Sequence, residues 1–169
     1  MLAFALLLAA AGPSETILTE DEVRQMKMVA SSRSAEAIGQ VRGLKGAALE
    51  SALREAVADK TRAVVIDGHG IYLVHAAPDG RVYGWFPGQP AVVVGTWGVQ
   101  KFSSKVIVAC QRFERPNVVA TGPYTAKECK AADATLGATD VLQQWDGDPF
   151  GLDGGRVPYV KAAWGLPTP

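Results

Sequence analysis

The chain has few residues of the types that most often carry catalysis or bind metals. Its 169 residues include only two cysteines and two histidines, Cys110, Cys129, His69 and His75. It contains no G-x-S-x-G nucleophile elbow, no G-x-x-x-x-G-K-[ST] phosphate-binding loop and no G-x-G-x-x-G motif after a strand. These absences argue against the commonest hydrolases, nucleotide-binding proteins and dehydrogenases.

An excess of positive charge is also missing. Lys plus Arg number 17, as do Asp plus Glu, and no basic run of five or more residues occurs. Proteins that bind nucleic acid need such charge, because neutralising phosphates supplies much of the affinity. The sequence therefore predicts no nucleic-acid partner.

The first twelve residues, MLAFALLLAAAG, are apolar and uncharged. They resemble the apolar end of a secretory signal peptide, with Ala9-Ala10-Ala11 as the cleavage region, although no basic residue precedes the run. The run is far shorter than the roughly twenty residues that span a bilayer, so we expect no membrane span. We expect residues 1–12 to be the remainder of a signal peptide, or else an apolar N-terminal helix, and 13–169 to form a single α+β domain. The first alternative places the protein in the periplasm or outside the cell.

In an exported protein, an even number of cysteines usually forms disulfides. The sequence therefore predicts a Cys110–Cys129 disulfide. The alternative is two unrelated thiols in a reducing compartment.

The first third of the chain has helical patterns. A capping-box pattern at residues 19–22 predicts a helix over 20–31, and the serine cluster at 31–34 predicts its end. A second helix is expected over 45–59, where apolar residues recur at helical spacing. Glycines between these segments favour a bend or two separate helices.

From residue 63, short β-branched or aromatic runs alternate with turn-forming pairs. The expected strands are 63–66, 71–75, 81–86, 91–99 and 105–113, with a sixth over 117–120. Links this short favour antiparallel neighbours. In the last long strand, alternation predicts Val106, Val108 and Cys110 on one face, with Lys105 and Gln111 on the other.

Beyond these strands, a second capping box at 125–128 predicts a short helix that carries Cys129. Residues 146–155 are rich in Gly and Asp and indicate a loop, and 156–164 are expected to return as a strand or a helix. The predicted class is α+β: N-terminal helices packed on a twisted antiparallel β-sheet or small open barrel, with one short helix after the main sheet.

Asp67, His69 and His75 are the candidate catalytic residues. A histidine between glycines on a turn is accessible, and Asp67 is placed to orient it. Two histidines and a carboxylate suit zinc, but a six-residue separation matches no standard ligand spacing. We expect a polar hairpin turn, with His75 facing solvent at a strand end, and we predict no metal and no cofactor.

The acidic segment Asp146-Gly147-Asp148, with Asp153 beyond it, has a composition that suits calcium. It lacks the EF-hand spacing and the closing glutamate. We therefore expect an acidic surface loop.

Aromatic residues concentrate in the β-rich part and are candidates to fill a core or to line a ligand cavity. With Arg112 as an anion-binding residue, the candidates for ligand binding are Tyr72, Tyr83, Trp85 and Trp97. The sequence favours an exported, non-enzymatic binding or accessory module that uses a sheet face or an aromatic-lined cavity. Its partner would be an unknown small molecule or protein. The alternative is a small hydrolase or metal-dependent enzyme centred on Asp67, His69 and His75.

Overall fold

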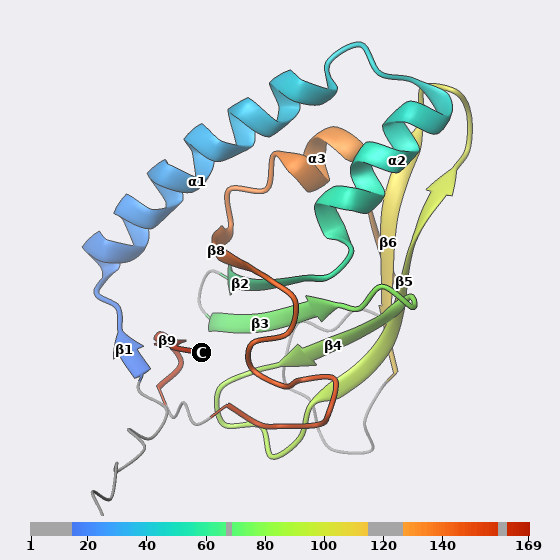
Figure 1. Ribbon diagram of the computed structural model, residues 1–169. Helices are drawn as coiled ribbons and strands as arrows, with labels where there is room; N and C mark the ends of the chain where they lie inside the picture. Colours follow the sequence, from blue (N-terminus) through green and yellow to red (C-terminus); the bar gives the residue numbers. More distant parts are fainter. Residues whose placement is uncertain (1–14, 67–68, 115–126, 159–161) are drawn as a thin grey trace, which may run out of the picture.

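The computed structural model describes residues 15–66, 69–114, 127–158 and 162–169. The elements are, in order, β1 (Glu15–Ile17), α1 (Glu20–Val41), α2 (Gly46–Val57), β2 (Lys60–Ile66), β3 (Gly70–Ala76), β4 (Arg81–Trp85), β5 (Val93–Lys101), β6 (Ile107–Phe113), β7 (Glu128–Ala131), α3 (Ala132–Leu136), β8 (Val141–Asp146) and β9 (Gly165–Pro167). The main sheet has seven strands in the order β7-β6-β5-β4-β3-β2-β8, and every neighbouring pair is antiparallel. The sheet curls into a half-barrel, and the helices pack against it (Figure 1). The predicted α+β class is confirmed.

Helix α1 begins at the predicted capping box. The amide of Glu22 donates to the Thr19 hydroxyl, and the Glu22 carboxylate accepts from the Thr19 amide at 2.7 Å. These reciprocal bonds satisfy two of the amides that a helix leaves unpaired at its first turn. They also lower the pKa of the Glu22 carboxyl, because the Thr19 amide and hydroxyl donate to its charged form.

The predicted end of this helix at 31–34 is wrong, since α1 continues to Val41. The hydroxyl of Ser31 donates to the carbonyl four residues earlier at 2.9 Å, so the serine is satisfied inside the helix. Ser34 is buried, and its hydroxyl donates to the Ala138 carbonyl at 3.3 Å. The cluster therefore attaches the middle of α1 to the connection between α3 and β8.

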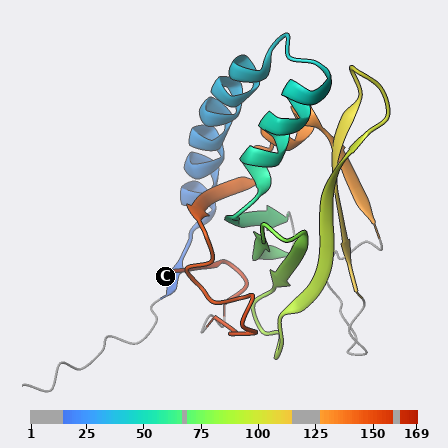
Figure 2. The ribbon, with the colours of Figure 1, turned by 45° about the vertical axis from the view of Figure 1, so that its right-hand side comes forward.

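The two helices are separate, as the glycines predicted. Gly43 and Gly46 adopt φ angles of +88° and +57°, which favour glycine, and the chain turns between them. Helix α2 then buries Leu49, Leu53 and Val57 against the sheet. Figure 2 shows α1 and α2 side by side, with the curled sheet beside them.

Each face of the sheet carries its own hydrophobic cluster. On one face, which we call the helix-side face, Val82, Trp97 and Ile107 pack with Leu49 and Leu53 of α2. The other face, which we call the loop-side face, is covered over β2, β3 and β4 by the segment that follows β8. Its cluster contains Ala63, Leu73, Tyr83, Trp85, Phe150 and Leu152. Because successive side chains point to opposite faces of a strand, neighbouring residues such as Val82 and Tyr83 belong to different clusters.

The Cys110–Cys129 disulfide is confirmed, but its second cysteine does not lie on a helix. Cys129 belongs to β7 and lies directly opposite Cys110 of β6, with the two Cα atoms 4.0 Å apart. The short helix begins only at Ala132. Thr125, the first residue of the predicted capping box, lies outside the described residues, as does the predicted strand over 117–120.

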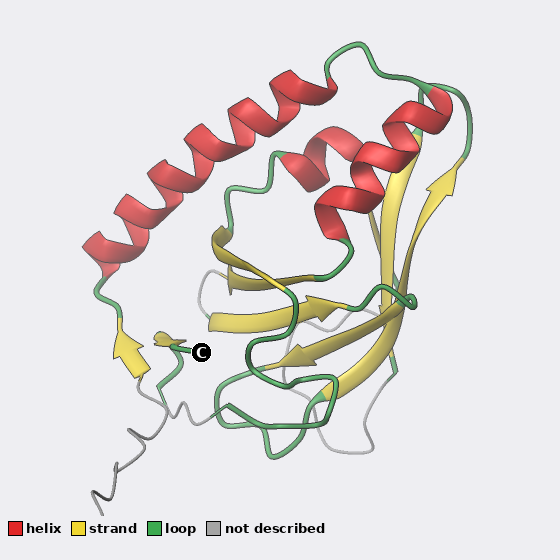
Figure 3. Cartoon of the chain, viewed as in Figure 1, coloured by secondary structure: helices red, strands yellow, loops and turns green. Residues whose placement is uncertain are grey.

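Further differences concern the ends of strands. The predicted grouping of Val106, Val108 and Cys110 on one face does not correspond to uniform burial: Val106 precedes β6 and is 50% exposed, Val108 is half-buried and Cys110 is buried. The expected loop after residue 146 is confirmed. The described parts of 156–164 form neither the predicted strand nor a helix, and β8, β1 and β9 were not predicted (Figure 3).

Within the described part of the chain, no helix is both long and apolar enough to cross a membrane.

Candidate functional site

The helix-side face encloses a hollow of about 100 Å³. Strand alternation directs Val64, Val74 and Val82 into it, and Val57 at the end of α2 completes its apolar wall. Trp97 closes this wall, and its indole N–H donates to the Ala77 carbonyl at 2.7 Å. The polar lining comes from β2, β3, β6, β7 and the α3–β8 region: Lys60, Arg62, Tyr72, Gln111, Glu128, Lys130, Thr135 and Asp140.

Arg62 is the central charged group of this lining. Its Nη2 donates to the Ala56 carbonyl at 2.6 Å, and its Nε donates to Gln144 at 2.9 Å. Among the described residues, Nη1 has no hydrogen-bond partner. The bond to Ala56 satisfies a carbonyl in the last turn of α2, where a positive charge also suits the helix dipole.

The electrostatic surroundings of Arg62 are mixed. Burial lowers the pKa of the guanidinium, and the nearby Asp140 and Tyr72 oppose this shift. An arginine side chain is not deprotonated in proteins, so Arg62 keeps its positive charge despite the lowered pKa. Arg62 is thus a fixed positive charge beside the hollow.

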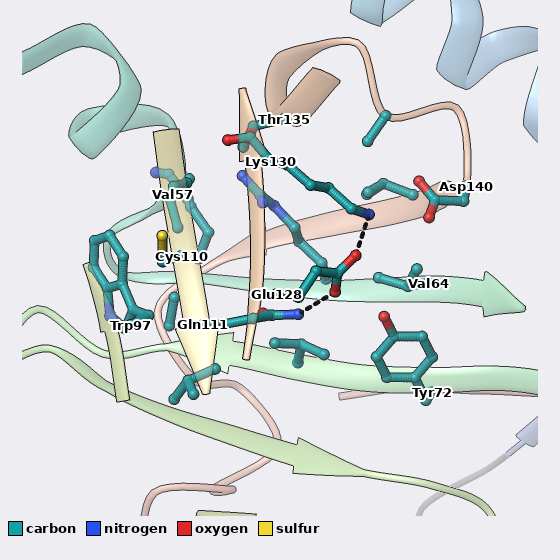
Figure 4. Close-up of a pocket in the computed structure, with 18 residues that line it drawn as sticks. Val57, Val64, Tyr72, Trp97, Cys110, Gln111, Glu128, Lys130, Thr135 and Asp140 are labelled. Carbon is teal, nitrogen blue, oxygen red and sulfur yellow. Dashed lines mark hydrogen bonds and ion pairs between the residues drawn. The ribbon is translucent and has the colours of Figure 1, made fainter. Parts of the chain in front are cut away.

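A second group of polar side chains lies on β6 and β7. Gln111 donates to the Glu128 carboxylate at 3.2 Å, and the Lys130 ammonium lies 3.4 Å from the same carboxylate. Figure 4 shows Glu128 between Trp97 on one side of the hollow and Tyr72 on the other. The Tyr72 ring is held by stacking on Phe86, with ring centroids 5.2 Å apart.

A larger hollow of about 200 Å³ adjoins the first, between α1, α3 and β8. The two share Arg62, Thr135, Ala138 and Val141 in their linings. Arg62 therefore contacts both hollows.

The structure brings together two of the predicted ligand-binding residues, Tyr72 and Trp97. Tyr83 and Trp85 are buried in the loop-side cluster, on the opposite face of the sheet. Arg112 is exposed and follows Gln111 on β6, so its side chain points away from the hollow.

The two histidines lie at opposite ends of β3. His69 is exposed just before the strand, and its amide donates to the Ile66 carbonyl at 2.9 Å, as in a turn. From Gly70 to His75 the strand extends about 17 Å, at about 3.3 Å per residue. Two imidazoles at this separation cannot bind one zinc ion, since each nitrogen must lie about 2 Å from it. Asp67 lies outside the described residues.

The expectation that His75 faces solvent is wrong, because only 2% of it is exposed. Its Nδ1 lies 3.1 Å from the Thr61 hydroxyl, which donates its single hydrogen to the Gly147 carbonyl at 2.5 Å. Nδ1 must therefore carry a hydrogen and donate it to the Thr61 oxygen. His75 thus connects β3 to the segment after β8.

The acidic segment makes ordinary structural contacts. Asp146 lies 2.6 Å from the Lys60 ammonium, and the Asp148 carboxylate accepts from the Asp153 amide at 2.8 Å. Within the described ranges, no three His, Cys, Asp or Glu side chains are grouped in a way that could hold a metal ion.

Of the polar lining, the sequence predicted only Tyr72 and missed Lys60, Arg62, Gln111, Glu128, Lys130, Thr135 and Asp140. The predicted first strand, 63–66, left Arg62 out, because β2 begins three residues earlier, at Lys60.

Comparisons with known protein families, with characterised proteins and with solved structures found no match to this chain.

Proposed function

We propose that this chain is an exported, non-enzymatic binding module that holds a small organic acid in the helix-side hollow. The observation that carries the proposal is the Nη1 group of Arg62, a fixed cation without a hydrogen-bond partner among the described residues, beside an apolar wall. Ligand sites commonly combine such a wall with a few placed polar groups. A carboxylate would accept from the guanidinium while a short carbon chain packs against Val74 and Val82.

The size of the hollow limits the ligand. An engineered cavity of about 150 Å³ binds benzene, so the hollow of about 100 Å³ suits a molecule of about four or five non-hydrogen atoms. Propionate has five such atoms, and lactate has one more. A longer acid would extend into the adjoining hollow, past Arg62.

The charge of the lining favours an acid over an amine. Lys60, Arg62 and Lys130 outnumber Glu128 and Asp140. The Glu128 carboxylate is already matched by Gln111 and Lys130, which leaves Arg62 the more available partner.

Export is supported by the disulfide between Cys110 and Cys129. Disulfides persist in oxidising compartments and are rare in the cytosol. A periplasmic or secreted location is therefore part of the proposal.

The test is titration of the full chain with propionate, lactate, propylamine and propanol, followed by backbone amide NMR shifts and tryptophan fluorescence. We expect the acids alone to bind, with a Kd between about 10 µM and 1 mM, because very small ligands gain at most about 1.5 kcal/mol per non-hydrogen atom. Shifts should centre on β2, β3 and β6.

Two variants separate binding from folding. Ala109→Leu adds volume at the hollow without removing a polar contact, so it should abolish acid binding in a folded protein. Arg112→Met, on the other face of β6, is the matched control and should bind as the parent does. Equal binding of acid and amine, or no shifts with any acid, would refute the proposal.

A further inference from the structure

Two connections that are far apart in the sequence meet at one end of the molecule. The turn between α1 and α2 lies beside the turn between β5 and β6, where the Gly46 amide donates to the Ser104 carbonyl at 2.8 Å (Figure 1). We call residues 42–46 and 101–106 together the tip. No residue of the tip lines the hollow described above.

The tip exposes large apolar side chains. Phe102 is 70% exposed, Val106 is 50% exposed and Leu44 is 37% exposed. The turn that carries them is well bonded: the Phe102 amide donates to the Val106 carbonyl at 2.9 Å, and the Ser103 hydroxyl accepts from the Val106 amide at 3.0 Å. The aromatic ring is thus presented to the outside by a fixed turn.

The tip also concentrates positive charge. Its exposed side chains include Arg42, Lys45, Lys101 and Lys105. No Asp or Glu occurs between Glu36 and Glu50, or between Asp79 and Glu114. The chain is neutral as a whole, so this distribution is uneven.

Two of the acids on adjacent elements are already engaged. Glu50 of α2 lies 3.6 Å from Arg54. Asp133, on the helix that follows β7, accepts from the Ala134 amide at 2.9 Å. Neither is paired with a cation of the tip.

We propose that the tip docks on the surface of an anionic phospholipid bilayer. Phe102 would enter the interface with Val106 and Leu44 beside it, and the four cations would contact lipid phosphates. A surface that combines exposed apolar side chains with cations matches the layers of such a bilayer, in which negatively charged headgroups lie above hydrocarbon. An aromatic ring is well suited to the boundary between them.

The experiment is co-sedimentation of the full chain with vesicles of phosphatidylglycerol and phosphatidylcholine in equal parts, compared with vesicles of phosphatidylcholine alone. We expect binding to the anionic vesicles only. Raising the salt from about 0.1 M to about 1 M should weaken it, because the Debye length falls from about 10 Å to about 3 Å.

Three variants locate the contact. Phe102→Ser should reduce the partition coefficient at least about tenfold, since an aromatic side chain no longer leaves water. Lys101→Gln with Lys105→Gln should reduce it by about fivefold for each charge removed. Val29→Ser, at an exposed apolar site on α1, is the control and should bind as the parent does.

Binding to neither vesicle, or equal binding to both, would overturn the proposal. So would retention of anionic-vesicle binding in both tip variants. Concentration-dependent dimerisation without lipid, abolished by Phe102→Ser, would instead assign the tip to a second copy of the chain.

Discussion

Gly95 offers the sharpest test of how the sheet curls. It lies on β5 opposite Phe113 of β6, and both residues are buried. A Cβ added at Gly95 would press against the Arg112 carbonyl oxygen and lie 2.7 Å from the Phe113 Cα. Both obstacles are backbone atoms of a paired strand, so they cannot rotate away as a side chain would. The close approach of β5 and β6 therefore requires glycine at this position.

We expect Gly95→Ala to lower the free energy of unfolding by about 3 kcal/mol, at the upper end of the range for overpacked sites. For a domain of this size, that loss corresponds to a Tm lower by about 6 to 12 °C. Gly98→Ala on the same strand is the matched control, because a Cβ there meets nothing within 4 Å. It should leave stability unchanged or raise it by about 0.5 kcal/mol, through the less flexible unfolded chain.

The assay is urea unfolding of the parent and both variants, followed by circular dichroism, with a comparison of m-values to confirm the same transition. A loss below about 1 kcal/mol for Gly95→Ala would refute the reasoning. An equal loss in both variants would also refute it. The loss would then come from a general effect of replacing glycine in β5, and not from a steric clash specific to Gly95.

The remaining predictions concern the cysteines, the histidines and the N-terminus. Replacing Cys110 and Cys129 together by Ser should cost about 3 kcal/mol in urea unfolding, from the entropy of a loop with a sequence separation of 19; an unchanged midpoint would contradict this. His69→Ala should change the free energy of unfolding by less than about 0.5 kcal/mol. His75→Ala should lower it by about 2 kcal/mol or more, because it leaves a buried cavity and removes the donor to the Thr61 oxygen. Stoichiometric zinc that is lost in His69→Ala would favour the enzyme alternative instead. Mass spectrometry of the protein from its native host should place the mature N-terminus between residues 12 and 15, and an intact Met1 would argue against export.

Local patterns in the sequence predicted much of the fold, because they act through near neighbours. The capping box at Thr19 needs only residues within one turn, and it begins α1 as expected. The turn-forming residues between the predicted strands 71–75 and 81–86 also act locally: the Asp79 carboxylate accepts from the Arg81 amide at 3.0 Å, and Gly80 adopts a φ of +90°.

The failures arose where distant contacts decide local structure. The serines at 31–34 are compatible with both a helix and a turn. Ser34 bonds to Ala138, which is 104 residues away in the sequence, so a local pattern cannot reveal this contact. Cys129 comes directly after a capping-box pattern that is typical of a helix start. Its segment nevertheless forms a strand, because it pairs with β6. Tertiary context thus overrides local propensity at both positions.

The candidate site was harder to predict than the fold because its residues share no motif. The hollow takes one or a few side chains from each of several strands, and strand register decides which ones face it. Tyr72 and Tyr83 are equally aromatic and lie on neighbouring strands, yet Tyr72 lines the hollow while Tyr83 packs beneath the segment after β8. A slip of one residue in β3 would exchange Tyr72 for Leu73 and replace a polar wall by an apolar one. The binding chemistry proposed for Arg62 therefore depends on the same register that builds the two clusters, and substitutions that preserve this register should preserve the site.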